Sequence, residues 1–336
     1  MIGYYVHHVG RGHLHRAIAI AAESTVPVVG LSSLSRPAEW TGEWVTLPRD
    51  DEGGPGREVT AAGHLHWVPV DDPGLRARTA ALSSWIAGAQ PRLLVCDVSV
   101  EVALLARLHG VRVASFVLPG RRDDAAHLLG FGVSSVLLAA WPSSVSGMLP
   151  GLPESLASRV RHVGGLSRFP ATPPHAVRRP GPWRVAVLLG RGGGAPSRSA
   201  LERVEAQTPG WGWTVLGGER SAWSDDPFSV IRDADVVICQ AGQNSIAEVA
   251  AAQRPALVLP AARPHDEQAT TAAALAAGGW PVEVAQTLPA AGWPTRLERL
   301  RGLDGRRWVD WCDGDAAGRA AEVLRRAHDV SLALPA

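Results

Sequence analysis

Short runs of β-branched and aliphatic residues alternate with Ala-, Leu- and Arg-rich segments along most of this chain. In the first half the apolar runs are 2–6, 26–31, 93–96, 111–117 and 136–138. Segment 101–109 follows one of these runs, and its apolar residues recur at helical spacing. Strands that alternate with helices are typical of βαβ units and a mostly parallel sheet. The sequence therefore predicts an α/β protein.

The alternation is interrupted between Gly165 and Pro182, a stretch with five prolines and no hydrophobic periodicity. Such composition is typical of a linker. The pattern then restarts, and 336 residues exceed what a single core usually supports. The expected parts are a Rossmann-like domain at 1–165, a linker at 166–181, a second Rossmann-like domain at 182–313 and a C-terminal helical segment at 314–336. Ligands of such sheets bind at the carboxyl ends of the strands, so we expect the site in a cleft between the domains.

Composition excludes several classes of protein. The formal net charge is +1, which gives no reason to expect a nucleic-acid partner. The three cysteines are far apart and lack CxxC spacing, so neither a zinc site nor a disulfide framework is indicated. No signal-peptide pattern opens the chain, and no apolar run is long enough to cross a bilayer. We expect a cytoplasmic protein, and peripheral contact with the inner face of a membrane is compatible with the sequence.

The strongest local signal is segment 234–250, which reads as a strand, a tight glycine turn and a helix. Free amide groups at a helix N-terminus favour phosphate, because the helix dipole and the unpaired N–H groups attract negative charge. Asn244 or Ser245 can cap the helix, and Glu248 is placed to accept hydrogen bonds from ribose hydroxyls. Taken alone, Ser245 to Glu248 fits a simple capping box about equally well. The candidate donor-binding residues here are Ala241, Gly242, Gln243, Asn244, Ser245 and Glu248.

A second candidate phosphate site is the glycine-rich segment 190–194, directly after the strand expected at 184–189. Glycines let backbone amides approach a diphosphate closely. With Ala195, the segment also fits the G-x-G-x-x-A pattern of NAD-dependent enzymes. That pattern opens the second half of the chain here, and the acid at Glu219 comes later than the pattern requires. The candidate residues are Gly190, Arg191, Gly192 and Gly193.

Segment 234–250 resembles the nucleotide-sugar motif of glycosyltransferase family 28, which includes the N-acetylglucosaminyl transferase of lipid II synthesis. The next loop matches as well, because strand 254–260 is followed by Arg-Pro-His-Asp-Glu-Gln at 263–268. The resemblance covers about 60 contiguous residues and implies a GT-B fold of two Rossmann-like domains with a cleft between them. It implies that the glycine loop contacts the donor pyrophosphate, with Arg191 adding a charge-assisted bond. It also implies that the final helix crosses back onto the first domain, and that the donor sugar is held by His265, Asp266, Glu267 and Gln268.

For the acidic residues at 266–268 a second interpretation stays open, namely the first turn of a helix, where negative charge is favoured. The N-terminal segment 10–16 resembles the first loop of many GT-B transferases through its Gly-x-Gly-His-x-x-Arg arrangement. His13 is the candidate general base for the acceptor hydroxyl, since imidazole titrates near neutral pH. Gly12 and Arg16 are candidates for binding the donor phosphates, although Arg16 fits a solvated helix position equally well.

The histidine run near the N-terminus leaves alternatives open. His7, His8 and His15 compete with His13 for each role, and His13 can instead bind phosphate. Metal binding is not expected, because His7 and His8 would point to opposite faces of a strand and no matching carboxylate or cysteine spacing accompanies them.

Two further loops follow strands of the first half and should open onto the cleft. Asp97 lies at a strand end and is the reserve candidate for the base. Arg121 and Arg122 are candidates for receiving an anionic acceptor, although capping and surface charge pairing explain these loops as well.

The sequence as a whole predicts a glycosyltransferase that moves a sugar from a nucleoside diphosphate, expected to be UDP, to a hydroxyl acceptor. The resemblance implies inversion at the anomeric carbon. We expect no metal or other cofactor, because the helix N-terminus and the glycine loop can neutralise the charge of the diphosphate. Two alternatives share the donor motifs, a nucleotide-sugar epimerase and a non-catalytic nucleotide-sugar sensor. The first half carries no recognisable acceptor signature, so the acceptor is left open.

Overall fold

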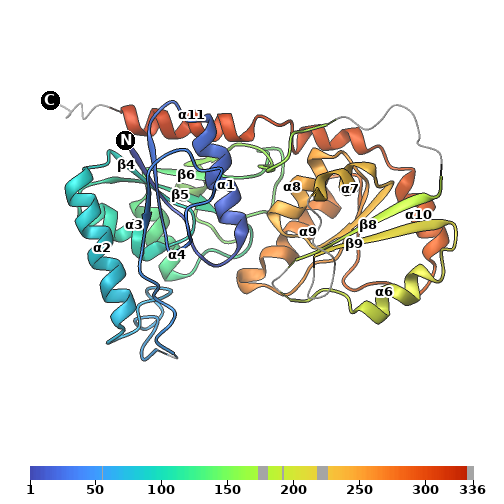
Figure 1. Cartoon of the computed structure of the whole chain (residues 1–336), viewed down its shortest axis with the longest axis horizontal. Coiled ribbons are helices and arrows are strands. Elements are labelled where there is room, and N and C mark those ends of the chain that lie inside the picture. Colours follow the sequence, from blue (N-terminus) through green and yellow to red (C-terminus); the bar gives the residue numbers. More distant parts are fainter. Residues whose placement is uncertain (55, 173–180, 191–192, 218–225, 331–336) are drawn as a thin grey trace.

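The computed structural model describes residues 1–54, 56–172, 181–190, 193–217 and 226–330. It contains two parallel sheets, with strand orders β3-β2-β1-β4-β5-β6-β7 and β12-β11-β10-β8-β9. Each sheet carries helices on both faces, and the two domains lie side by side along the long axis of the molecule (Figure 1). The predicted α/β class with parallel sheets is confirmed.

The first sheet forms because its central strands β1, β4 and β5 bury both faces, as parallel strands do. Its strands are β1 (Ile2–Tyr5), β2 (Val28–Ser32), β3 (Trp44–Thr46), β4 (Leu93–Cys96), β5 (Arg112–Val117), β6 (Val136–Ala139) and β7 (Val160–His162). Its helices are α1 (Arg11–Glu23), α2 (Pro73–Ala89), α3 (Val100–Leu108), α4 (Ala125–Val133) and α5 (Glu154–Ala157).

Alternation along the strands divides this core into two layers. Tyr4 and Val95 point to the face covered by α1, whereas Tyr5 and Leu94 point to the face covered by α2 and α3. The last helix, α11 (Ala316–Asp329), packs on the α1 face, where Leu324 is 2% exposed. It runs from the second domain back along the first (Figure 1).

The second sheet has the same organisation around a smaller core. Its strands are β8 (Trp183–Leu189), β9 (Trp211–Gly217), β10 (Val236–Cys239), β11 (Ala256–Val258) and β12 (Val282–Val284). Its helical elements are α6 (Arg198–Glu205), α7 (Pro227–Asp233), α8 (Gln243–Ala251), η1 (Pro264–Asp266), α9 (Glu267–Ala277), α10 (Trp293–Arg301) and η2 (Gly305–Asp310). Helices α6 and α10 cover one face of this sheet, and α7, α8 and α9 cover the other.

An apolar cluster joins the two domains on one side. Trp141 and Met148, from the segment after β6, belong to the same buried cluster as Trp308 and Trp311 of the second half. The backbone N–H of Gly165 donates to the Trp311 carbonyl at 2.6 Å, which ties the end of the first domain to the second. None of the helices in the described parts of the chain has the length and apolar composition that a bilayer crossing requires.

Candidate active site

Three loops of the second domain meet at the carboxyl ends of β8, β10 and β11. The side-chain amide of Gln240 donates to the Gly193 carbonyl at 3.0 Å, and Arg263 donates to the same oxygen at 3.1 Å. A Cβ atom on Gly190 would lie 2.7 Å from the end of the Gln240 side chain, so a larger residue would displace that side chain from this position. The predicted glycine loop therefore lies against the predicted phosphate-binding turn. Arg191 and Gly192 lie outside the described residues.

Helix α8 begins earlier than expected. Gly242 is the N-cap, and no side chain within the described residues caps the helix. The prediction that Asn244 or Ser245 caps it is therefore wrong, because both lie inside the first turn. Among the described residues no side chain caps the backbone N–H groups of this turn, and uncapped amides at a helix N-terminus are what an anion site requires. Ala241, which precedes the cap, is fully buried.

Glu248 lies one turn into α8, and its side chain is 14% exposed. Burial raises the pKa of Glu248, and the nearby Arg168 opposes that rise. The Arg168 guanidinium donates to Oε1 of Glu248 at 2.8 Å. Arg168 belongs to the segment predicted as a linker. The carboxylate expected to hold ribose is therefore paired with an arginine from that segment.

The four residues expected to hold the donor sugar lie in different environments. Gln268 is 5% exposed, and its Oε1 accepts from the Ala261 backbone N–H at 2.9 Å. Glu267 pairs with Arg122 of the first domain at 3.4 Å. His265 and Asp266 both have positive φ, 60° and 56°, which is uncommon for residues with a Cβ.

The N-terminal domain places His13 and Asp97 together. Nδ1 of His13, in the first turn of α1, lies 3.1 Å from Oδ2 of Asp97, which follows β4. Asp97 is fully buried, and Arg16 lies 3.2 Å from its other oxygen. Burial alone would raise the pKa of Asp97, but Arg16 and His13 together hold it below its usual value. Arg16 is itself 5% exposed and stacks on Phe116, so it is not the solvated helix residue that one interpretation allowed.

The other histidines of the N-terminal run have separate partners. The expectation that His7 and His8 point to opposite faces of a strand is wrong, because β1 ends at Tyr5 and the two rings stack at 4.9 Å. His8 contacts Asp51 at 2.9 Å. Burial lowers the pKa of His7 from 6.5 to about 4, with repulsion from His13 and His8 acting in the same direction.

The two predicted motifs face each other across the cleft. A Cβ atom on Gly12, at the start of α1, would lie 2.1 Å from the Asn244 side chain at the start of α8. The N-terminus of α1 therefore approaches the N-terminus of α8 as closely as glycine permits. His15, Arg16, Asn244 and Glu248 line a small cavity of about 10 Å³ at this contact. The candidate base and the candidate donor site thus belong to one region.

Two larger cavities lie near the His13–Asp97 pair, which lines the smaller of them. One, of about 240 Å³, lies between the domains and is lined by His13, Asp97 and Phe116 together with residues of η1. The other, of about 560 Å³, lies in the first domain between the β1–α1 loop, α2 and α3. Its walls include His7, Trp67 and several leucines, and its surface is predominantly apolar. Both cavities are lined by His66, Val98 and Ser99.

The two arginines expected to receive an anionic acceptor differ in environment. Arg121 is largely exposed and pairs with Asp123 at 3.2 Å. Arg122 is 6% exposed, donates to the Pro119 carbonyl and lines the cavity between the domains. Only Arg122 therefore reaches the cavity next to the candidate base.

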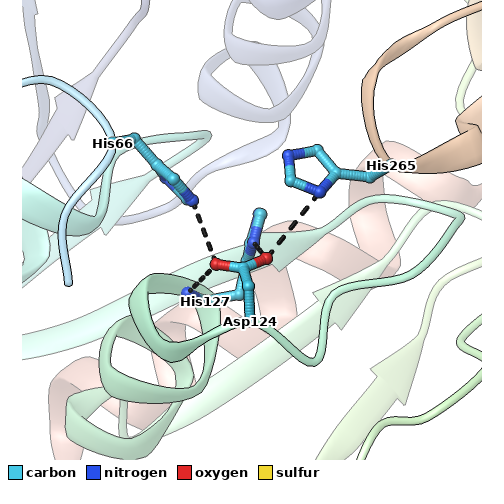
Figure 2. Close-up of side chains that lie close together, drawn as sticks. All are labelled: His66, Asp124, His127 and His265. Carbon is cyan, nitrogen blue, oxygen red and sulfur yellow. Dashed lines mark hydrogen bonds and ion pairs between the residues drawn. The ribbon is translucent and has the colours of Figure 1, made fainter. Parts of the chain in front are cut away.

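A cluster of three histidines and one aspartate, which no motif in the sequence predicted, lies beside this cavity. Figure 2 shows His66, His127 and His265 converging on Asp124. The Asp-x-x-His spacing of Asp124 and His127 at the start of α4 could have predicted two neighbouring side chains of this cluster. No spacing could have predicted His66 and His265, because they come together only through the packing of distant loops.

Comparison with known proteins finds a family match in the second domain. Residues 219–287 match the Glycosyltransferase family 28 C-terminal domain. A UDP-N-acetylglucosamine--N-acetylmuramyl-(pentapeptide) pyrophosphoryl-undecaprenol N-acetylglucosamine transferase from Thiobacillus denitrificans is 31% identical over 133 residues. That alignment covers 38% of this chain and 36% of the relative, so the chain matches about a third of the relative's length.

Solved glycosyltransferase structures share the whole fold. The kitacinnamycin glycotransferase superposes with a TM-score of 0.65 at 18% identity, covering 97% of this chain and 98% of its own. MurG from Acinetobacter baumannii gives a TM-score of 0.64 at 15% identity, and the superposition covers 97% of this chain and 99% of MurG. A calicheamicin glycosyltransferase gives a TM-score of 0.65 at 17% identity, and the superposition covers 99% of each chain.

The fold is therefore GT-B, as the sequence predicted. The resemblance to the family 28 nucleotide-sugar transferases is also confirmed, most specifically in the second domain.

Proposed function

We propose that this protein transfers a sugar from a nucleoside diphosphate, with UDP as the expected nucleotide, to a hydroxyl group of an apolar acceptor. The observation that carries the proposal is the His13–Asp97 pair, which lies beside the contact between α1 and the donor helix α8. A base next to a nucleotide-sugar site is what direct transfer to a hydroxyl requires.

The contact between His13 and Asp97 supports a different role for each ring nitrogen of His13. Nδ1 donates to the Asp97 carboxylate, which leaves the Nε2 lone pair free to accept a proton. Nε2 takes the acceptor hydroxyl proton as that oxygen forms a bond to the anomeric carbon. The bond from this carbon to the diphosphate oxygen breaks, and the nucleoside diphosphate leaves with the electron pair. A single displacement of this kind inverts the anomeric centre.

Charge on the departing diphosphate is balanced by backbone groups. The free amides of the first turn of α8 and of the glycine loop at Gly190 and Gly193 are the proposed donors. The transfer itself is proposed to need no metal or other cofactor. Glu248 is proposed to hold the ribose hydroxyls, and binding would then exchange Arg168 for the nucleotide.

The acceptor is proposed to occupy the two cavities next to His13. The larger cavity is mainly apolar, so a lipid or an apolar small molecule fits it better than a polysaccharide chain. Arg122 borders the smaller cavity and is proposed to contact a polar group of the acceptor. We propose a cytoplasmic location, with peripheral contact at the inner face of a membrane if the acceptor is a lipid, and no nucleic-acid partner.

Thermal-shift titration with UDP, dTDP, GDP and NAD tests the donor site. A ligand that binds only the folded state raises the melting temperature by mass action. We expect a shift with UDP or dTDP that weakens in Glu248→Ala and persists in Glu202→Ala. Glu202 is a suitable control because it lies in the same domain and is 57% exposed. A shift with NAD alone would overturn the proposal.

Product analysis then separates transfer from the alternatives. The protein is incubated with a sugar derivative of the nucleotide that it binds and with a panel of apolar hydroxyl compounds. The nucleotide and sugar products are then separated by chromatography. Released nucleoside diphosphate with a glycosylated acceptor supports the transferase. An isomeric nucleotide sugar indicates an epimerase, and tight binding without turnover across the panel indicates a sensor.

A further inference from the structure

A cluster of four potential metal ligands spans the two domains at the edge of the inter-domain cavity. Nε2 of His66 lies 3.3 Å from Oδ1 of Asp124, and Nδ1 of His127 lies 2.5 Å from Oδ2. His265, in the second domain, places Nδ1 3.7 Å from the same carboxylate. One ligand atom from each of the four lies within 4.8 Å of all the others. The rings surround the carboxylate from three sides (Figure 2).

The backbone holds each of these side chains in place. Glu101 accepts from the backbone N–H of His66 at 2.7 Å, which fixes the loop between β3 and α2. Asp124 is the N-cap of α4 and accepts from the backbone N–H of His127 at 3.1 Å. The backbone N–H of Arg121 donates to the His265 carbonyl at 2.8 Å, across the two domains. His265 keeps a left-handed backbone at φ 60°, and such uncommon conformations concentrate at functional sites.

From this arrangement we propose that His66, Asp124, His127 and His265 bind one divalent transition-metal ion of the zinc class, which links the two domains. Neutral imidazole and carboxylate are the ligand types that zinc accepts, and four such ligands complete a tetrahedral shell. The ligand separations need to change by no more than about 1–2 Å to reach the distances of such a shell. This proposal departs from the prediction that the protein binds no metal. That prediction was based on the histidines near the N-terminus, and the three histidines of this cluster lie elsewhere in the chain.

The protonation states suit a cation. Burial is the main cause that lowers the pKa of His127 to about 4 and that lowers the pKa of His265, so both rings are neutral at neutral pH. Burial alone would raise the pKa of Asp124, but its bonds to His127 and His66 hold it well below the usual range. His127 and His265 therefore offer lone pairs, and Asp124 offers one negative charge.

Arg122 and Glu267 are the charged groups that face the cluster from the side of the cavity. Arg122 lies 3.3 Å from Nε2 of His127, on the side of the ring away from Asp124. When Nδ1 of His127 binds the ion, its proton moves to Nε2, and the Arg122 guanidinium must turn from the ring. The Pro119 carbonyl and Glu267, which it already contacts, can keep it paired.

The ligand count determines what the ion does. Four protein ligands leave no open position for water or substrate, which is the pattern of structural rather than catalytic zinc. Because the ligands come from both domains, the ion would hold the cleft in the closed arrangement. This inference adds to the proposed transferase chemistry and does not depend on it.

Metal titration of the untagged protein tests the site. Co²⁺ serves as the spectroscopic probe and Zn²⁺ as the calorimetric one, and we expect one tight site per chain with the absorption of a tetrahedral Co²⁺ ion. His265→Asn keeps a residue that tolerates the left-handed backbone but removes the imidazole. It should weaken Zn²⁺ binding by more than the roughly 10- to 100-fold that outer-shell changes cause. His66→Ala should have a comparable effect.

Two controls locate the ion. His8, Asp50 and Asp51 form the other potential metal-binding group among the described residues, so His8→Ala reports on that site. His109→Ala removes an exposed histidine whose ring hydrogen-bonds Ser83, away from the proposed site. Both variants should bind Zn²⁺ as the parent does. Unchanged binding in His265→Asn, or a loss confined to His8→Ala, would overturn the proposal.

Hydrogen exchange tests the link between the domains. Zn²⁺ should slow exchange both in segment 118–127 and in segment 261–268, and the protection should disappear in His265→Asn. The melting temperature of each variant without metal shows that it is folded. Protection of the first segment alone would contradict a bridging ion.

Discussion

At the scale of single residues, replacing His13 and replacing Asp97 should have different effects on turnover and on stability. His13→Ala removes the proposed base, so turnover should fall roughly 10²- to 10⁴-fold, with a smaller loss of stability than at Asp97, because Arg16 still pairs with the buried carboxylate. Asp97→Asn should lower turnover and also reduce the free energy of unfolding by about 3–5 kcal/mol, because Arg16 loses its buried charged partner. Transfer rates and urea unfolding measure both effects. Equal turnover in His13→Ala and the parent would exclude His13 as the base.

His7 gives stability a pH dependence. Its folded-state pKa is about 4 against an ordinary value of 6.5, chiefly because the ring is buried. The unfolded chain therefore binds a proton as the pH falls through about 6.5, whereas the folded chain does so only near 4. Stability due to this residue is present above that window and is lost on acidification. His7→Asn should reduce the loss of unfolding free energy between pH 7 and 4 by roughly 1–3 kcal/mol. His64→Asn is the exposed control, and identical pH slopes for parent and His7→Asn would contradict the assignment.

At the scale of elements, the contact between α1 and α8 should control donor binding. Gly12→Ala places a methyl group against the Asn244 side chain, so the helix N-termini must separate or Asn244 must turn away. We expect the donor KM to rise about tenfold, the equivalent of about 1.4 kcal/mol of lost binding, with kcat less affected.

A double-mutant cycle compares Gly12→Ala and Asn244→Ala with the variant that carries both changes. If the clash is the cause, Gly12→Ala should have little further effect once Asn244 is shortened, because residues in contact are not additive. Additive effects of the two changes would place the cause elsewhere.

Elements also mark the limit of what sequence can predict. The central strands of both sheets, the β10–turn–α8 motif and the His13 loop follow from periodicity and glycine placement, which are local signals. The short strands β3, β7 and β12 were not predicted, because three residues are too few to show a pattern. The N-cap of α8 was misplaced by two or three residues, because Gly242 takes the extended cap conformation and leaves Asn244 inside the helix. The pairing of Glu248 with Arg168, and the convergence of His66 and His265 on Asp124, depend on packing between distant segments. No spacing in the sequence encodes those contacts.

At the scale of the whole molecule, α11 makes the first domain depend on the far end of the chain. It follows the second domain in sequence, yet Leu324 lies in the first domain's core and the Ala327 carbonyl accepts from Arg112 at 3.3 Å. The N-terminal amine also contacts His328 at 3.2 Å. The second domain is thus inserted between two parts of the first, and the apolar cluster around Trp141 and Trp311 joins their cores.

Leu324→Ala should therefore lower stability by about 2–5 kcal/mol, the usual effect of truncating a buried leucine. Because the domains share a buried cluster, calorimetry should show one transition that moves to lower temperature as a whole. Leu108→Ala is the matched control, since Leu108 is 84% exposed and its loss should change stability by less than about 0.5 kcal/mol. Hydrogen exchange in β4 and β10 should accelerate together in Leu324→Ala. Two separate transitions, with the second domain unaffected, would show that the cluster does not couple the domains and that α11 stabilises the first domain alone.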